Sequence, residues 1–358
     1  MQTIVNLADI EREALTKLSA NAREYYVGGA ADEITVRQNQ TAFQNISLLP
    51  RVLRNVAHRS LQTSLLGETF AMPIGIAPTA MQRLAHKDGE FATAHAAAAM
   101  RVPMILSTTA TVAVEDVAKV AGVSLWFQVY VYKDREVTRE IAQRAAQSGC
   151  KALVLTVDAP YLGKREREVR VGFHLPPNVD LPNYRQLGST SVRAGVGESG
   201  LARHFLDNID PALTWEDVEW LQAASGLPVV VKGILRGDDA VLAQQHGAAG
   251  VIVSNHGGRQ LDTAAATIDA LAAITDALGG SIEVMLDGGI RRGTDVLKAL
   301  ALGAKAVFLG RPILWGLSYD GEQGVQRVLE ILRDEFDLAM ALCGCRSVAE
   351  IDAGLVVV

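Results

Sequence analysis

The sequence predicts an α/β fold: an eight-stranded parallel β/α (TIM) barrel with an N-terminal helical segment and a long loop after strand 4. The main observation is that short apolar, β-branched runs recur eight times from about residue 72, each followed by a polar residue or glycine and then by an alanine-rich helical stretch. The runs are almost continuously apolar, which is typical of strands buried on both faces of a parallel sheet. Most of them lie about 20–35 residues apart, which is enough for one crossover helix.

The predicted strands cover residues 74–79, 104–108, 125–131, 152–158, 229–233, 251–256, 284–288 and 306–310. Eight units without a topological break favour a closed barrel over an open doubly wound sheet. A barrel of this kind needs about 250 residues, so about 100 of the 358 remain to be explained. We therefore predict a single domain over residues 1–358, with an N-terminal helical cap at 1–65, the barrel at 72–345 and an excursion within it at 160–210.

The two additions to the barrel differ in their pattern. Residues 9–18 carry apolar side chains at helical spacing, and a second short helix is predicted at residues 22–26, before a pair of glycines. The connection that leaves strand 4 at Asp158 runs for about 70 residues, and its middle, residues 176–200, is rich in Pro, Gly, Ser and Asn. Such a long loop is either a tolerated surface insertion or a lid over the active site.

Charge, apolar content and cysteine usage exclude several classes of protein. The formal net charge of −6 argues against a nucleic-acid-binding protein, which would have a basic domain. No uncharged apolar run reaches the roughly 18 residues of a membrane helix, and no basic segment leads into an apolar one at the N-terminus, so we expect neither membrane insertion nor a signal peptide. The cysteines Cys150, Cys343 and Cys345 make neither a disulfide framework nor a metal site, which favours a reducing, cytoplasmic location.

Polar side chains collect where the predicted strands end, and in β/α barrels this end of the strands carries the active site. The strand-end residues are Thr79, Ser107, Gln128, Tyr130, Thr156, Asp158, Lys232, Ser254, His256, Asp287 and Arg311. Each alone has a structural explanation, since a strand-end Asp or Ser often caps the next helix. A single lysine is often solvated there, and a single histidine is often structural. Their convergence on one rim nevertheless predicts a catalytic site.

Two segments suit a bound phosphate. Residues 287–293, Asp-Gly-Gly-Ile-Arg-Arg-Gly, follow strand 7, and residues 310–312, Gly-Arg-Pro, follow strand 8. Glycine-rich turns, a helix N-terminus and an arginine favour a phosphate monoester, and barrels commonly use these two loops for it. No G-x-G-x-x-G motif follows an N-terminal strand, so a mononucleotide or sugar phosphate is favoured over a dinucleotide.

The motif Ser-Asn-His-Gly-Gly-Arg-Gln-Leu-Asp at residues 254–262 resembles the signature of FMN-dependent 2-hydroxy-acid oxidising enzymes, the family of glycolate oxidase, lactate oxidase and mandelate dehydrogenase. The agreement spans nearly the whole chain. The other matching segments are Tyr25-Tyr26 with Gly28 or Gly29, and residues 77–82, 127–130, 155–160, 232–233, 286–293 and 310–312.

The resemblance implies an FMN cofactor whose isoalloxazine ring lies over the barrel mouth. The residues expected to contact the ring are Ala77, Pro78, Thr79, Ala80, Ser107, Gln128 and Thr156. Lys232 would lie beside N1 and O2, where a cation stabilises the negative charge of the reduced flavin. The residues expected to hold the ribityl chain and the phosphate are Ser254, Asp287, Gly288, Gly289, Arg291, Gly310 and Arg311.

The resemblance also implies how the substrate is bound. Arg259 and Tyr25 would bind its carboxylate, with Arg165 as a second guanidinium nearby. Glycolate oxidases typically have a bulky aromatic residue where this chain has Thr109, so we expect it to favour lactate, longer 2-hydroxy acids or mandelate over glycolate. Lactate oxidases, however, often have alanine where this chain has Thr79.

The implied catalytic residues are His256, Asp158, Tyr130 and Lys232. His256 would be the general base, since its ordinary pKa near 6.5 suits proton removal at neutral pH. Asp158 would orient the imidazole and stabilise its protonated form, and Tyr130 would bond the 2-hydroxyl. Hydride transfer and formation of a carbanion both remain open.

The resemblance therefore implies a soluble, homotetrameric FMN-dependent (S)-2-hydroxy-acid oxidase that gives a 2-oxo acid and hydrogen peroxide. Its expected partners are a small 2-hydroxy acid and O2, with no nucleic acid, no membrane and no metal. A dehydrogenase or monooxygenase on the same scaffold is the nearest alternative. A lyase that forms a Schiff base on Lys232 and a flavin-binding protein without catalytic activity are further alternatives.

Overall fold

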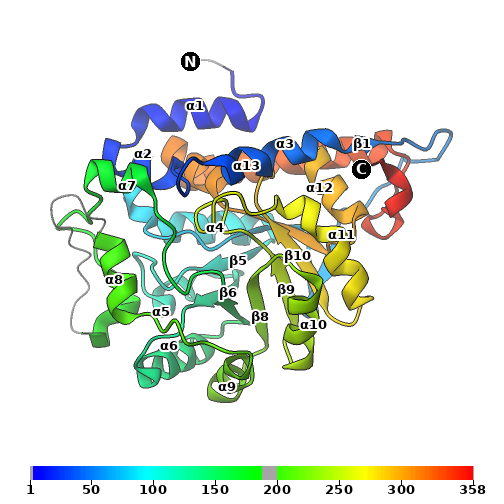
Figure 1. The fold of residues 1–358 in the computed structure, drawn as a ribbon. Helices are drawn as coiled ribbons and strands as arrows, with labels where there is room; N and C mark the ends of the chain where they lie inside the picture. The colour runs from blue at the N-terminus through cyan, green and yellow to red at the C-terminus, as the bar shows by residue number, and fades with distance from the viewer. Residues whose placement is uncertain (1–2, 188–199, 358) are drawn as a thin grey trace.

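The computed structural model describes residues 3–187 and 200–357, and it shows eight parallel strands closed into a barrel with helices outside (Figure 1). The strands in order are β4 (Ile74–Ile76), β5 (Pro103–Leu106), β6 (Ser124–Val129), β7 (Leu153–Thr156), β8 (Val229–Ile234), β9 (Gly250–Val253), β10 (Glu283–Asp287) and β11 (Ala306–Leu309). β11 pairs with β4 in parallel and closes the barrel. The predicted fold class is confirmed. Most of the predicted strands run on too far at their C-terminal ends, because the last residues of each run turn into the loop above the barrel.

The barrel interior is filled by the alternate side chains of its strands. Trp126 of β6 and Phe308 of β11 meet there, with ring centroids 5.8 Å apart. A hairpin of β2 (Thr63–Leu65) and β3 (Glu68–Phe70) contributes Leu65 and Phe70 to the same buried cluster. The sequence analysis did not predict this hairpin, because strands of three residues carry too little periodicity to be recognised. It belongs to the apolar core of the barrel, so the barrel is packed rather than open.

Each barrel strand is followed by at least one helix on the outside. These helices are α4 (Glu90–Met100), α5 (Val114–Val117), α6 (Arg135–Gln147), α9 (Glu216–Ser225), α10 (Gly237–Gln245), α11 (Thr267–Leu278), α12 (Gly293–Ala301) and α13 (Arg311–Leu342). α13 contains a kink, where Asp320 and Gly321 leave the helical conformation.

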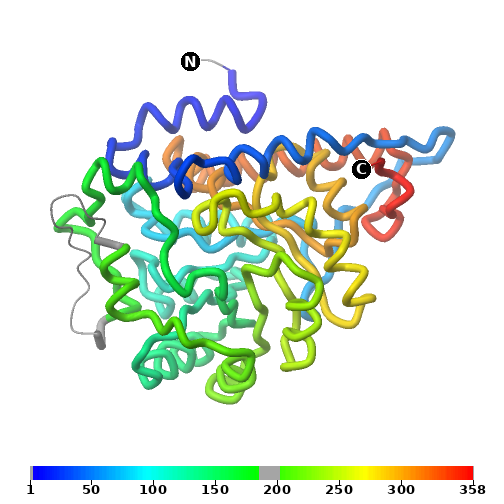
Figure 2. Tube along the Cα trace, in the orientation of Figure 1, coloured from blue at the N-terminus to red at the C-terminus, as the bar shows by residue number. Residues whose placement is uncertain are grey.

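The N-terminal segment forms α1 (Leu7–Lys17), α2 (Ala20–Val27) and α3 (Ile34–Asn45). Asn6 and Ser19 cap α1 and α2 through their side-chain oxygens, as the residues preferred at helix N-termini do. Both helices were predicted, whereas α3 was not distinguished within the cap. Figure 2 shows this blue segment beside the C-terminal residues, where β1 (Ser47–Leu48) pairs with β12 (Val356–Val357).

The long connection after β7 is not structureless in its described part. It contains α7 (Glu166–Val171), the 3-10 turns η2 (Pro182–Leu187) and α8 (Gly200–Asn208). Asn183 ties it to the barrel, because its side chain accepts from Val114 N and donates to Thr108 O. Part of the predicted loop, residues 188–199, lies outside the described residues.

Within residues 3–187 and 200–357, no helix is both long and apolar enough to cross a bilayer. The same residues contain no cluster of three His, Cys, Asp or Glu side chains that could hold a metal ion. All three cysteines are free and buried.

Candidate active site

A cavity of about 1160 Å³, part of it open to solvent, lies at the C-terminal ends of the barrel strands. Nearly all the residues predicted for the site line it: Tyr25, Ala77, Pro78, Thr79, Ala80, Ser107, Thr109, Gln128, Tyr130, Thr156, Arg165, Lys232, His256, Arg259, Asp287, Gly288, Gly289, Arg291, Gly310 and Arg311. The other two, Asp158 and Ser254, lie behind the lining and are hydrogen-bonded to His256 and Lys232. The structure thus brings every predicted site residue together.

The cavity is also lined by residues to which the sequence analysis gave no role of their own. Six of them lie in segments that it named: Tyr26, Gly257, Ile290, Phe308, Leu309 and Pro312. The others were not singled out at all: Val36, Asn39, Gln40, Leu162, Phe205 and Leu314. Several come from α2, α3 and α8, which lie outside the barrel, so the rule that chemistry collects at strand ends could not find them.

The segment from Ser254 to Arg259 is shaped by a left-handed turn. His256 has φ of 59°, and the two glycines after it have φ of 65° and 74°. Gly258 is required by close approach as well, because a Cβ there would lie 2.7 Å from Val36 N. The Ser254 hydroxyl accepts from His256 N at 3.1 Å, and the Asn255 side chain accepts from Gly258 N at 3.1 Å. These bonds direct the His256 ring into the cavity.

His256 and Asp158 form a partly buried pair. The Nδ1 atom of His256 lies 2.9 Å from Oδ1 of Asp158. Burial lowers the pKa of His256 below its ordinary value, and the Asp158 carboxylate opposes this shift. Burial alone would raise the pKa of Asp158, but His256 and Lys232 together bring it below its usual value. At neutral pH the pair therefore consists of a carboxylate and a neutral imidazole, which is the state that a general base needs.

Lys232 forms a second pair, which is buried and joins two barrel strands that are separated by β9. Its Nζ atom lies 3.1 Å from Oδ2 of Asp287 and donates to the Ser254 hydroxyl at 2.8 Å. Lys232 is on β8 and Asp287 is on β10, so the strand ladder fixes both backbones. The ammonium group of Lys232 is therefore held in the cavity lining by Asp287 and Ser254.

The carbonyls at the C-terminal end of α2 accept from two arginines of the cavity. Nη1 of Arg259 donates to Tyr25 O at 2.7 Å and to Gly28 O at 2.6 Å. Arg311 donates to Tyr26 O at 3.0 Å, and also to Gly28 O at 3.0 Å. The last carbonyls of a helix have no partner within the helix, and its C-terminus favours cations. This explains how a helix far from the barrel in sequence comes to carry Tyr25 into the cavity.

Arg259 and Arg165 share one buried carboxylate. Nη2 of Arg259 lies 3.2 Å from Oε1 of Glu168, and Nη1 of Arg165 lies 3.3 Å from the same oxygen. The Arg259 guanidinium also lies 4.9 Å from the centroid of the Tyr25 ring, which stacks on Phe173. Glu168 was missed by the sequence analysis, although its position three residues after Arg165 was the available signal.

Tyr130 and Phe205 form the wall beside His256. Burial raises the pKa of Tyr130, with a smaller contribution from Asp158, so its hydroxyl remains protonated and can donate. The Phe205 ring meets Tyr130 edge-on, with centroids 4.8 Å apart. Thr109 lies in the same cavity lining, and its hydroxyl bonds to that of Ser107 at 2.8 Å.

A family model described as FMN-dependent dehydrogenase matches residues 14–358. The chain belongs to this family. An L-lactate oxidase from Nostoc sp. is 51% identical over 352 residues, which are 97% of this chain and 96% of that protein. 2-Hydroxyacid oxidase 1 from Homo sapiens is 51% identical over 356 residues, or 99% and 96% of the two chains. Glycolate oxidase from Spinacia oleracea is 49% identical over 348 residues, or 97% and 94%.

The fold agrees with a solved structure as well. Mandelate oxidase with (S)-4-hydroxymandelic acid superposes with a TM-score of 0.93 at 43% sequence identity, covering 97% of each chain. The predicted family is therefore confirmed, and this FMN-dependent dehydrogenase family member has FMN as its cofactor.

The buried polar atoms of the cavity fit FMN. Gln128 Nε2 and Asp287 Oδ1 are buried and find no hydrogen-bond partner in the part of the chain that the structure describes. They offer one donor and one acceptor to the ring and the ribityl hydroxyls. Burial lowers the pKa of Arg311 to about 9 and that of Arg291 to about 10. Both guanidiniums lie where a phosphate is expected, and an anion beside them would raise their pKa values back toward the ordinary value.

Proposed function

We propose that this FMN-dependent dehydrogenase family member oxidises an (S)-2-hydroxy acid to the 2-oxo acid and passes the electrons to O2, giving hydrogen peroxide. The observation that carries the proposal is the shared cavity, where a neutral His256 held by Asp158 faces a hydroxyl donor, Tyr130, and two guanidiniums. The names of the relatives, which are oxidases of lactate, glycolate and 2-hydroxy acids, support the same reaction.

The substrate would be fixed at both of its polar groups. Arg259 and Arg165 would bind the carboxylate from the cavity wall, and the fork of a guanidinium suits that group. The protonated Tyr130 hydroxyl would donate to the 2-hydroxyl or to the oxo group that replaces it. With the carboxylate and the 2-hydroxyl fixed, the hydrogen on C2 would also have to lie toward the group that removes it. These three constraints together would select one enantiomer.

The proton released from the substrate would be accepted by His256. Its Nδ1 atom is hydrogen-bonded to Asp158, so Nε2 is the atom that would take the proton. The Asp158 carboxylate then lies beside the imidazolium and stabilises it. FMN, when bound, supplies the acceptor for the two electrons. Lys232 would stabilise the negative charge on the reduced ring, and Asp287 and Ser254 hold its ammonium group in place.

A panel of substrates under anaerobic conditions tests the proposal. Purified holoenzyme is mixed with glycolate, (S)-lactate, longer (S)-2-hydroxy acids and (S)-mandelate, and bleaching of the oxidised flavin is followed; air is then admitted and peroxide is measured. Reduction by one of these acids followed by stoichiometric peroxide supports the oxidase. Reduction without peroxide indicates the dehydrogenase. Loss of carbon dioxide from the product indicates the monooxygenase. An unreactive flavin contradicts the proposal, and trapping of Lys232 by borohydride would then support the lyase.

Thr109 is the residue in the cavity lining that bears on the size of the preferred substrate. A threonine in the cavity lining leaves more room than an aromatic side chain would, so we propose that lactate, longer 2-hydroxy acids or mandelate are preferred over glycolate. Thr109→Trp is expected to shift the ratio of kcat/KM toward glycolate by about tenfold, since a methylene in a binding pocket is worth about 1–3 kcal/mol. An unchanged preference would contradict the assignment. Homotetrameric assembly stays a prediction from the resemblance, and a cytoplasmic location stays a prediction from the cysteine usage.

A further inference from the structure

Glu168 is a buried carboxylate that contacts the two cavity arginines from the protein side. It belongs to α7 and is 1% exposed. Its Oε1 atom accepts from Arg165 at 3.3 Å and from Arg259 at 3.2 Å. Both arginines line the cavity, whereas Glu168 is not part of the lining. The carboxylate therefore touches both guanidiniums without occupying the space of a substrate.

This contact changes the charge that the arginine pair presents. Burial lowers the pKa of Arg259, Arg165 lowers it further by repulsion, and Glu168 acts in the opposite direction. The buried Arg165 guanidinium and the partly buried Arg259 guanidinium share one carboxylate, so the three groups carry a net charge of plus one. A monoanion that binds these arginines from the cavity side balances this positive charge completely. A dianion would leave one negative charge without a partner, and buried unpaired charges are costly.

We propose that Glu168 is a positioning residue that holds Arg165 and Arg259 together and sets the charge of the carboxylate pocket, so that it selects monocarboxylates over dicarboxylates. The inference rests on the proposed function, which assigns the substrate carboxylate to these arginines. It adds the residue that sets the limit on substrate charge: 2-hydroxy dicarboxylic acids are rejected because the pocket holds one net positive charge.

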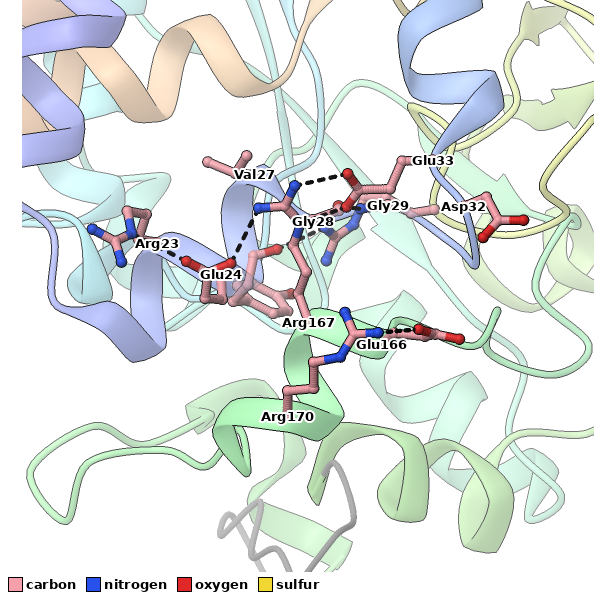
Figure 3. A network of polar contacts seen from close by, with 12 residues as sticks. Arg23, Glu24, Val27, Gly28, Gly29, Asp32, Glu33, Glu166, Arg167 and Arg170 are labelled. Carbon is pink, nitrogen blue, oxygen red and sulfur yellow. Dashed lines mark hydrogen bonds and ion pairs between the residues drawn. The ribbon is translucent and has the colours of Figure 1, made fainter.

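The same short helix offers a matched control. Glu166 is 36% exposed and forms an ion pair with Arg170, whose side chain is 71% exposed. Figure 3 shows this pair apart from Arg167, which reaches Glu24 and Glu33 of the N-terminal segment. Glu166→Gln therefore removes the same charge from the same helix without touching the two cavity arginines.

The test uses oxalate and oxamate, which have nearly the same shape but carry two charges and one charge. Both are titrated into oxidised holoenzyme, and Kd is read from the perturbation of the flavin absorption. Glu168→Gln is expected to raise the preference for oxalate over oxamate by at least about tenfold, because the removed negative charge repels the dianion twice as strongly. Glu166→Gln is expected to leave the ratio of the two Kd values within about twofold of wild type. Glu168→Asp, which keeps the negative charge, is expected to give a ratio of the two Kd values near that of wild type.

An unchanged ratio in folded, flavin-loaded Glu168→Gln enzyme overturns the proposal. If that variant does not fold, the double variant Arg165→Gln/Glu168→Gln removes one charge of each sign and keeps the net charge. Its ratio is expected to stay near the wild-type value, and a shift of tenfold in it would overturn the proposal. Because binding is read without turnover, these results are distinguishable from a failure of the proposed function, in which no 2-hydroxy acid reduces the flavin.

Discussion

The two ends of the cavity are built from different parts of the molecule. Lys232 and Asp287 belong to barrel strands, and the parallel ladder fixes their backbones. Tyr25 and Glu168 belong instead to α2 and α7, which lie outside the barrel. Side-chain bonds hold these helices, including those from Arg259 and Arg311 to the end of α2. The half of the site that fits the flavin is thus supported by the hydrogen-bonded strand ladder. The substrate half is held instead by apolar packing, a few loop main-chain bonds and charged side chains.

This difference in support indicates which part of the site carries the shared chemistry and which part carries the substrate preference. Groups on a rigid scaffold suit chemistry that every member of a family performs, and groups on connecting segments suit properties that vary. Substitutions at the strand ends should therefore abolish flavin reduction. Substitutions in the two additions should change substrate affinity and selectivity while flavin binding is kept.

The largest effect is expected for His256→Ala. The variant should still bind FMN, since His256 accounts for only one part of the cavity wall, but it loses the proton acceptor. General base catalysis contributes roughly 10²–10⁴-fold, so the rate of flavin reduction should fall by about 10³-fold or more. Anaerobic stopped-flow measurement of flavin bleaching checks this. Ordinary turnover in a flavin-loaded variant would refute the base assignment.

Asp158→Asn is expected to have the next largest effect. The rate should fall by about 10²-fold, the lower end of what acid–base catalysis contributes, because the imidazolium loses its counter-charge. Asp158 raises the pKa of His256 against the effect of burial, so its removal lowers that pKa further. His256 must be neutral to act as a base, and the acid limb of kcat/KM should therefore move to lower pH. A pH profile of kcat/KM measures this, and a limb that moves to higher pH would contradict the assigned pair.

The fold could be predicted from the sequence because its signal is repeated. Eight apolar runs, each followed by a helix, leave little alternative to a closed parallel barrel, and the closed order of β4 to β11 confirms it. The strand-end side chains could be predicted for the same reason, because a barrel brings the ends of all its strands to one rim. Tyr25 did not follow from this rule, and only the family resemblance indicated it.

The parts that were missed depend on tertiary contacts. Phe205 enters the cavity because α8 packs its ring against Tyr130, and nothing in its sequence neighbours indicates this. Asn39 lines the cavity from α3 because its side chain bonds to Asn255, 216 residues away. Glu168 lies on a six-residue helix rich in charge, where an exposed ion pair is the ordinary expectation. The burial of Glu168, on which its proposed positioning role depends, was visible only in the structure.

Arg259→Lys should affect the substrate half more than the flavin half. Lysine keeps the charge but loses the planar fork, and with it the simultaneous bonds to Tyr25 O, Gly28 O and Glu168. KM should rise and kcat should fall, each by about tenfold, while the flavin content stays near wild type. Steady-state kinetics together with the ratio of flavin absorbance to protein absorbance measures both. Unchanged kinetics would reject the role of Arg259 in binding the carboxylate.

The smallest effect is expected for Arg167→Met, which tests how firmly the two additions are joined. Arg167 donates to Glu33 at 2.7 and 2.9 Å and to Glu24 at 3.2 Å, and so bridges α7 to the helices on either side of Gly28 (Figure 3). Methionine keeps an apolar stem beside Gly28 but removes both ion pairs. Because the side chain is 40% exposed, solvent weakens these pairs, and we expect a loss of about 1 kcal/mol or less.

A thermal scan of the holoenzyme should show the melting temperature of Arg167→Met lowered by about 1–3 °C. KM should rise by about two- to threefold, because the carbonyls of α2 still bond to Arg259 and Arg311 and keep Tyr25 near its place. Arg170→Met, which breaks only the exposed pair with Glu166, serves as the control and should leave KM unchanged. A rise in KM beyond tenfold in Arg167→Met would show that the bridge, rather than the arginines in the cavity, holds the substrate half together.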